Sequence, residues 1–327
     1  MNVNVNVGVN VNAAPPTVLL LTGPTGSGKS ELALQLADAL QPQLAVEIIS
    51  ADSVLVYRGM DIGSAKPSMQ ARARVPHHLI DIRDPAHSYS AGDFVRDARA
   101  AIEDIHRRGR LPLLVGGTML YLRALYDGLA PMPPASLELR RELNAQAALA
   151  GWPALHAELA QVDAAAAARI ARNDAQRIQR ALEVHRLTGV PISLWQRRGG
   201  GTRADYRWLR YALVPAERGE WNRHLAARFE AMLRAGLLQE VQALYARGDL
   251  DQRHAAVRAV GYRQLWRYCE GASSLGEATQ RAIIATRQLA KRQLTWLRRE
   301  PAVTLLPAHA VGLVAMVARS IQEAARA

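Results

Sequence analysis

The sequence has little of what marks a secreted or membrane-spanning protein. Its 327 residues include one cysteine, Cys269, which excludes an internal disulfide and a cysteine-based zinc cluster and favours a reducing, cytoplasmic environment. No apolar run approaches the roughly 18–20 residues that span a bilayer, so no membrane partner is expected. Residues 1–16 have no charged side chain and largely alternate Val with Asn, which is unlike a secretion signal. We expect a disordered tail there, with an extra edge strand as the alternative.

Charged residues balance in one part of the chain and not in the other. Residues 17–134 hold 12 basic and 12 acidic side chains, whereas residues 135–327 hold 29 basic and 17 acidic ones. The net charge of +12 therefore lies wholly in the second part, which predicts a polyanionic partner. On charge alone, arginine-rich helices with solvated outer faces explain the pattern equally well.

A complete phosphate-binding motif follows the first predicted strand. The sequence GPTGSGKS matches G-x-x-x-x-G-K-[ST] between a strand at 18–22 and a helix with leucines at 32, 36 and 40. Glycines let backbone N–H groups converge on an anion, and the helix N-terminus adds its dipole. Lysine there neutralises phosphate oxygens and the serine hydroxyl holds Mg²⁺. The candidate diphosphate-binding residues are Gly23, Pro24, Thr25, Gly26, Ser27, Gly28, Lys29 and Ser30, with Ser30 as the metal ligand.

Further strands and helices alternate along the chain. Apolar runs at 46–50 and 111–115 are typical of buried strands, and 93–108 reads as a helix that begins at Ser90 and Asp93 and stops before Gly109. This rhythm predicts an α/β fold, a P-loop NTPase-like parallel sheet flanked by helices. An ATPase usually supplies a second acid at the end of a neighbouring strand. The 111–115 strand ends without one, so Asp52 is the nearest candidate, for the metal or for another role.

The middle of the chain reads as an insertion. Prolines at 131, 133 and 134 mark a break, and 136–198 is alanine-rich and helical, with Asp174 as an N-cap and Gly189 as a stop. A glycine-rich linker at 199–202 precedes a returning strand at 208–214. We therefore expect a tail over 1–16, an α/β core over 17–134, an all-helical insertion domain over 135–204, and a helical, basic return to the core over 205–327.

Several blocks in order resemble the tRNA dimethylallyltransferase (tRNA isopentenyltransferase) family, over about residues 18–299. The P-loop is similar except that Gly26 stands where that family usually has Ala. The other blocks are Asp52-Ser53, VYRGMDIG at 56–63, AKP at 65–67, PHHLID at 76–81, GGTMLY at 116–121, ND with QR and RALE at 173–183, VGYRQ at 260–264, and TRQLAKRQ with Trp296 at 286–296. Their order and spacing make coincidence improbable.

The resemblance implies a specific use of the phosphate cradle. Enzymes of this family transfer a dimethylallyl group from dimethylallyl diphosphate to N6 of an adenosine adjacent to the anticodon, releasing diphosphate. The P-loop would hold the leaving diphosphate with Mg²⁺ as cofactor. Asp52 would be the base that takes the N6 proton, and Thr118 would hydrogen-bond the amine or the bridging oxygen. Arg258 and Arg287 are candidates for stabilising the diphosphate. Alternatives are a second-shell Mg²⁺ role for Asp52 and a helix N-cap for Thr118.

The basic part supplies the expected tRNA contacts. Residues 253–300 hold 10 basic and 3 acidic side chains with interleaved aromatics, a combination typical of binding to unpaired RNA. We interpret Trp266 and Trp296 as core anchors and the arginines as RNA ligands. The candidate tRNA-binding residues, including those from the resemblance, are Asp52, Ser53, Val54, Leu55, Thr118, Arg140, Gln176, Arg177, Ile178, Gln179, Arg180, Arg258, Ala259, Val260, Gly261, Tyr262, Arg263, Lys291, Arg292, Gln293, Leu294, Thr295, Trp296, Leu297 and Arg298.

Three other functions fit parts of the sequence. A P-loop kinase of a small metabolite would not need the basic half. An RNA-binding NTPase switch would need nucleotide-dependent RNA affinity. A transferase acting on free adenine nucleotides would have no use for the helical insert. Length and charge asymmetry favour tRNA as the partner, and we expect a monomer.

Overall fold

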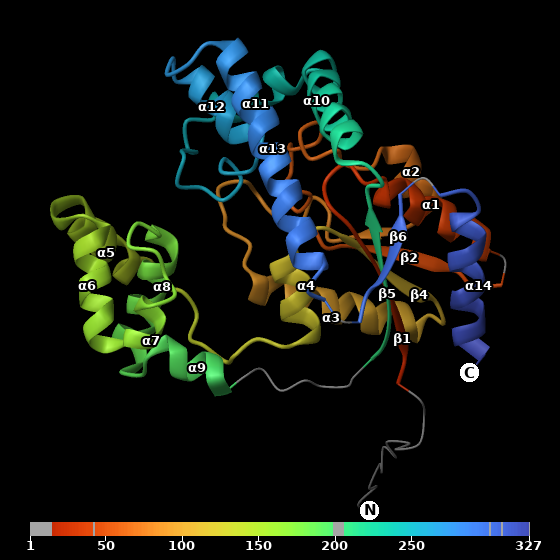
Figure 1. The fold of residues 1–327 in the computed structure, drawn as a ribbon, viewed down its shortest axis with the longest axis horizontal. Coiled ribbons are helices and arrows are strands. Elements are labelled where there is room, and N and C mark those ends of the chain that lie inside the picture. The colour runs from red at the N-terminus through yellow and green to blue at the C-terminus, as the bar shows by residue number, and fades with distance from the viewer. Residues whose placement is uncertain (1–14, 42, 199–205, 301, 309, 327) are drawn as a thin grey trace, which may run out of the picture. The chain divides into compact units, whose positions relative to one another are not determined.

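The chain divides into two compact units. The computed structural model describes residues 15–41, 43–198, 206–300, 302–308 and 310–326. One unit comprises the chain up to Leu122 and from Ala204 onward, and the other spans Arg123–Arg203 (Figure 1). The expected tail, apart from residues 15 and 16, and the linker expected at 199–202 lie outside the described residues.

A six-stranded parallel sheet forms the centre of the first unit, in the order β3-β2-β4-β1-β5-β6. The strands are β1 Thr17–Thr22, β2 Val46–Ser50, β3 His77–His78, β4 Leu111–Gly116, β5 Arg207–Val214 and β6 Thr304–Pro307. The parallel sheet and its four longer strands confirm the prediction from the sequence. The edge strands β3 and β6 have two and four residues, too few for a readable alternation.

The carboxyl ends of the three central strands lie side by side. Thr22 of β1 is in register with Gly116 of β4, and Ser50 of β2 with Val115. The segments that follow these strands therefore emerge together, as at the ligand-binding edge of other open parallel sheets. These segments hold the P-loop, Asp52 and Thr118.

Helices cover both faces of the sheet. The helices of this part of the chain are α1 Lys29–Leu40, α2 Met69–Arg74, α3 Ala91–Arg107, α4 Met119–Tyr126, α10 Arg218–Arg234, α11 Leu237–Tyr245, α12 Tyr262–Cys269, α13 Leu275–Leu297 and α14 Leu313–Arg326. Of these, α10 to α13 pack on one another. α1 and α14 pack on one face through a shared apolar core, and α3 lies on the other side of the strands (Figure 1). α3 begins after its N-cap Ser90, one of the two expected start signals, and Ser90 and Asp93 form a capping box there. Within the described ranges, no helix combines the length and apolarity needed to cross a membrane.

In the second unit, the regular elements among the described residues are all helices. Its helices are α5 Leu137–Ala150, α6 Trp152–Val162, α7 Ala164–Ala167, α8 Ala175–Thr188 and α9 Ile192–Arg198. α8 starts and stops as predicted, with the Asp174 side chain accepting from the Arg177 N–H and Gly189 in a left-handed conformation. The unit begins before the boundary expected at 134/135. Met132 packs on the core of this unit and the Pro133 carbonyl accepts from Arg180.

Candidate active site

A cavity of about 480 Å³ lies at the carboxyl ends of the central strands. Its lining is polar at the P-loop and after β2, and largely apolar along α10 and α13, where the residues recur at helical spacing. These lining residues are Thr25, Gly26, Lys29 and Ser30 of the P-loop, Asp52, Val54 and Leu55 after β2, Leu225, Arg228, Phe229 and Met232 of α10, and Thr286 and Leu289 of α13. The cavity therefore joins a charged end to an apolar wall.

The P-loop backbone is arranged to receive an anion. Gly26 and Gly28 have φ values of 80° and 83°, which glycine adopts without steric cost. α1 starts directly after Gly28 with no side-chain cap, so its first N–H groups are oriented for a ligand. A Cβ on Gly26 would lie 2.7 Å from Leu225 Cδ2. Glycine at this position thus also lets α10 pack directly on the loop.

Two cations, Lys29 and Arg228, line the cavity. Burial lowers the pKa of Lys29; the nearby Asp52 carboxylate opposes this shift, and the charge of Arg228 adds to it. Burial also lowers the pKa of Arg228. Two partly buried cations that line the same space repel one another unless an anion lies between them. A diphosphate carries the charge and the oxygens that such a site needs.

Asp52 is held in a fixed orientation. Its Oδ1 accepts from the N–H groups of Val54 at 2.8 Å and Leu55 at 3.4 Å. Within the described residues Oδ2 has no hydrogen bond, and the residue lines the cavity. Thr118 ties down the neighbouring backbone, because its Oγ1 accepts from the Ser53 N–H at 3.0 Å and donates to Ser53 Oγ at 3.3 Å. The carboxylate thus has one anchored oxygen and one free for a substrate proton.

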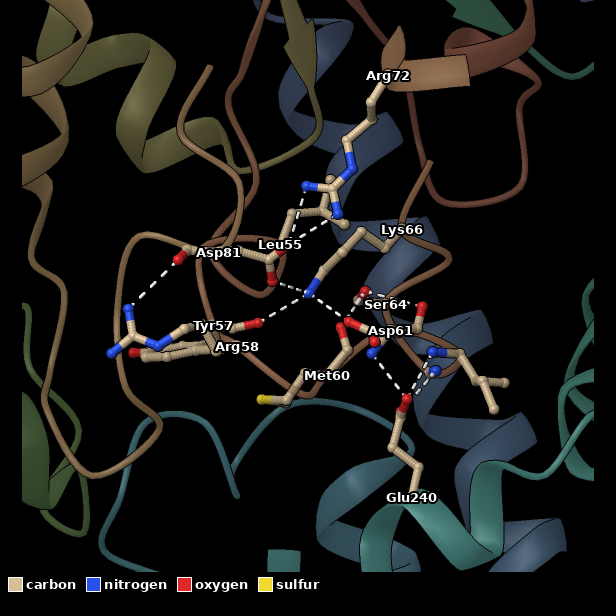
Figure 2. A network of polar contacts seen from close by, with 12 residues as sticks. Leu55, Tyr57, Arg58, Met60, Asp61, Ser64, Lys66, Arg72, Asp81 and Glu240 are labelled. Carbon is tan, nitrogen blue, oxygen red and sulfur yellow. Dashed lines mark hydrogen bonds and ion pairs between the residues drawn. The ribbon is translucent and has the colours of Figure 1, made fainter. Parts of the chain in front are cut away.

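Glu240 of α11 holds one wall of the cavity. Its carboxylate accepts from three successive backbone N–H groups, those of Asp61 and Ile62 at 2.7 Å each and of Gly63 at 3.1 Å. The Tyr262 hydroxyl donates to the same carboxylate at 2.6 Å. Figure 2 shows Glu240 reaching up to this turn from its helix. A single carboxylate therefore satisfies four donors.

The same wall contains strained backbone supported by ion pairs. Ala65, Leu79 and Asp81 have positive φ values of 54°, 61° and 59°, which are unfavourable outside glycine. Lys66 bonds the Tyr57 carbonyl and the carboxylates of Asp61 and Asp81, as Figure 2 shows. Arg72 donates twice to Asp81. Burial raises the pKa of Asp81, but these hydrogen bonds outweigh it, so the net shift is downward. The polar network holds a conformation that local preference disfavours.

Replacing Glu240 with Ala should lower the free energy of unfolding by about 3 kcal/mol, because four donors lose their shared acceptor. Glu240→Gln should lose less, since its amide oxygen still accepts. Urea unfolding measures both. Glu230→Ala, an exposed carboxylate on α10, is the matched control. A Glu240→Ala protein as stable as this control would show that the wall does not depend on the carboxylate.

Comparisons with known proteins show which family the chain belongs to. A family model described as IPP transferase matches residues 55–300. The chain belongs to the IPP transferase family. It is 52% identical over 315 residues to a tRNA dimethylallyltransferase of Bordetella pertussis, covering 96% of this chain and 98% of that protein. A tRNA isopentenylpyrophosphate transferase of Bacillus halodurans has a similar solved structure, with a TM-score of 0.68, 37% identity, and coverage of 94% of this chain and 96% of that chain.

A crystal structure of a eukaryotic relative acting on tRNA is also similar to this chain. This dimethylallyltransferase structure matches with a TM-score of 0.74 and 27% identity, over 90% of this chain and 74% of that chain. The three IPP transferase relatives together match the present chain over nearly its full length. The resemblance seen in short sequence blocks thus extends to the whole fold.

The sequence analysis did not predict one cation that lines the cavity of this IPP transferase. Arg228 lines the cavity, whereas Arg258 and Arg287 do not; both are exposed, and Arg287 donates to the Asn222 carbonyl at 3.2 Å. The available signal was an arginine between Leu225, Phe229 and Met232, on the apolar face of a helix. Such a residue requires a buried anionic partner. Of the remaining predicted residues, Thr25, Gly26, Lys29, Ser30, Asp52, Val54, Leu55 and Val260 line the cavity.

The expected RNA-binding residues of the C-terminal part fall into two groups. Arg258, Arg263, Lys291, Arg292, Thr295 and Arg298 are exposed, and Ala259, Val260, Leu294 and Trp296 are half-buried. Gly261, Tyr262, Gln293 and Leu297 are buried. Trp266 is a core residue, as predicted, with 2% of its surface exposed. The exposed cations are available to a phosphate backbone, and the buried members organise the protein.

Within the second unit, the predicted RNA ligands include two arginines that are already paired. Arg140 and Arg180 both bond the buried Glu183 carboxylate. Burial alone would raise the pKa of Glu183, but the hydrogen bonds from the two arginines lower it by more, so the net shift of the pKa is downward. Gln176 and Arg177 are exposed, Gln179 bonds Arg140 and Asn144, and Ile178 is buried.

Proposed function

We propose that the chain transfers a dimethylallyl group from dimethylallyl diphosphate to N6 of an adenosine adjacent to the anticodon of tRNA. The products are N6-(dimethylallyl)adenosine and diphosphate. One observation supports this most directly: Lys29, Ser30, Arg228 and Asp52 line a single cavity that also has a largely apolar side formed by α10 and α13. The charged end suits a diphosphate, the apolar wall suits a five-carbon allyl chain, and the carboxylate suits a weakly acidic amine.

The reaction follows from these positions. The N6 lone pair attacks the allylic C1 carbon, forming a C–N bond as the C1–O bond to diphosphate breaks. Asp52 Oδ2 accepts the N6 proton as the nitrogen loses electron density. The leaving diphosphate gains negative charge, and Lys29, Arg228 and the N–H groups at the start of α1 stabilise it. Thr118 fixes the backbone beside Asp52 through Ser53. No phosphoryl group is transferred.

The residues present also fit a Mg²⁺ ion. Ser30, the second residue of α1, lines the cavity, and its hydroxyl would give Mg²⁺ an oxygen ligand of the kind the ion prefers. In the described parts of the chain, no three acidic, histidine or cysteine side chains are placed so that they could hold a metal ion together. Mg²⁺ commonly takes one or two protein oxygens together with substrate phosphates and water. When bound, the ion would neutralise charge on the diphosphate.

The acceptor is proposed to be tRNA because the second part of the chain is strongly basic. The exposed arginines and lysine on α13 and before α12 offer phosphate contacts, and an unpaired loop adenosine leaves its stack at low cost. The protein is proposed to act as a cytoplasmic monomer. RNA affinity should fall steeply as salt rises.

A transfer assay tests the proposal. Purified protein, Mg²⁺, labelled dimethylallyl diphosphate and unmodified bulk tRNA are mixed, with free AMP and ATP-plus-metabolite reactions in parallel. Label should appear in tRNA at an adenosine next to the anticodon. Label only in AMP, or ATP turnover without transfer, would indicate one of the other functions instead.

A further inference from the structure

Gln293 is a buried polar residue that the proposed mechanism leaves unused. It lies on α13, where its exposed fraction is 8% although its neighbours Lys291 and Arg292 are exposed. Thr286, Leu289 and Gln293 recur at three- and four-residue spacing, and the first two line the cavity. The Gln293 side chain is therefore on the face of α13 that turns toward the donor site.

The Gln293 amide joins two segments of the active site. Its Oε1 accepts from the Thr25 N–H of the P-loop at 2.9 Å and lies 3.4 Å from the Thr25 hydroxyl. Its Nε2 donates to the Gly117 carbonyl at 2.8 Å. One side chain thus ties the loop after β1 to the loop after β4, across a sequence separation of 268 residues to Thr25.

The second of these loops leads directly to the proposed base. Gly117 precedes Thr118, whose hydroxyl accepts from the Ser53 N–H beside Asp52. A Cβ on Gly117 would lie 2.7 Å from Gln293 Nε2 and 3.0 Å from the Gly23 carbonyl, so the segments are in close contact. A continuous path of hydrogen bonds and backbone therefore runs from the diphosphate cradle through Gln293 to the base.

We infer that Gln293 is a positioning residue that sets the distance between the donor cradle and the base in the reaction proposed above. It touches no reacting atom. Its amide anchors Thr25, at the beginning of the P-loop, while the N–H groups at the start of α1 are left for the diphosphate. Attack on C1 needs the leaving group, carbon and amine in line, and a 1 Å error can cost about 100-fold in rate. Both contacts need a neutral amide, which donates with one atom and accepts with the other.

The wild-type protein is first shown to transfer the dimethylallyl group to tRNA. Three variants are then compared with it. Gln293→Ala should lower the single-turnover rate about 100-fold at saturating substrates. It should change the Kd of inorganic diphosphate by less than about tenfold and leave the tRNA Kd unchanged. Gln288→Ala, an exposed glutamine on the same helix, should match wild type. Melting temperatures and circular dichroism of all variants check that they are folded.

Gln293→Glu provides a pH readout that a loss of packing would not give. Its carboxylate still accepts from Thr25 but repels the Gly117 carbonyl, and burial raises the pKa of the introduced carboxyl. Protonation restores the donor, so the ratio of the Gln293→Glu rate to the wild-type rate should rise from pH 8 toward pH 5.5, while the Gln293→Ala ratio stays flat.

Two results would overturn the inference while leaving the proposed function intact. One is a Gln293→Ala rate within about threefold of wild type. The other is a raised tRNA Kd with an unchanged saturated rate, which would make Gln293 an RNA contact. Absence of transfer by the wild type would instead refute the proposed function.

Discussion

Replacing Asp52 with Asn should lower the transfer rate about 1,000-fold while leaving the fold and both substrate affinities nearly unchanged. Asn keeps an Oδ1 that can accept from the Val54 and Leu55 N–H groups, at 2.8 and 3.4 Å in the wild type. It removes only the proton-accepting carboxylate oxygen that faces the cavity. Single-turnover transfer of label to tRNA measures the effect. An Asp52→Asn variant that keeps more than about a tenth of the wild-type transfer rate would rule out Asp52 as the base.

Two further variants distinguish loss of the proton acceptor from loss of the backbone hydrogen bonds that the Asp52 side chain accepts. Asp52→Ala also frees the two N–H groups, so it should be less stable than Asp52→Asn by about 1 kcal/mol. Asp84→Asn is the matched control, because Asp84 Oδ1 makes a similar turn contact with the Ala86 N–H at 2.9 Å but does not line the cavity. This control should transfer at the wild-type rate.

The Mg²⁺ concentration distinguishes the two roles considered for Asp52. If the carboxylate mainly positions the ion, Asp52→Asn weakens Mg²⁺ binding, and excess Mg²⁺ restores much of the rate. If it takes the N6 proton, the defect persists at saturating Mg²⁺. We expect persistence, because Oδ1 is occupied by backbone N–H groups and the remaining oxygen is needed for the proton.

Local patterns predicted the parts of the site that depend on neighbouring residues. The P-loop lies between β1 and α1 as expected, and Asp52 and Thr118 follow adjacent parallel strands. These positions follow from strand, turn and helix signals within about ten residues, together with the rule that parallel strands end at one edge. Asp174 and Gly189 bound α8 for the same local reason.

Residues that act through distant packing were not predictable in this way. Arg228 reaches the cavity only because α10 packs across the P-loop, through contacts such as Leu225 with Gly26. Gln293 was grouped with basic neighbours as an RNA ligand, but its buried amide contacts Thr25 and Gly117. Glu240 accepts from a turn 177 to 179 residues away. A single sequence contains no periodicity that reports such pairings.

Replacing Lys29 should cause the second large loss of transfer activity, and diphosphate binding should depend on pH through the Lys29 amine. Lys29→Ala removes a cation from the leaving group and should lower the transfer rate by about 100- to 1,000-fold and weaken diphosphate binding. Lys29→Arg retains charge and should keep part of the affinity. Arg234→Met, which removes an exposed cation from the helix that holds Arg228, is the control and should bind diphosphate as the wild type does.

The sign of the pH effect follows from the lowered pKa of Lys29 in the free protein, which burial causes. Bound diphosphate favours the protonated amine, so binding raises the Lys29 pKa and takes up protons as pH passes through the lowered value. The contribution of Lys29 to the affinity for inorganic diphosphate should therefore be lost as pH rises through this lowered pKa and the amine of the free protein loses its proton. Lys29→Arg should lose less affinity over this range, because a guanidinium stays charged up to about pH 12. Calorimetry in buffers of different ionisation enthalpy measures the affinity and the proton uptake together. If wild type and Lys29→Arg weaken in parallel, the titrating group is not Lys29.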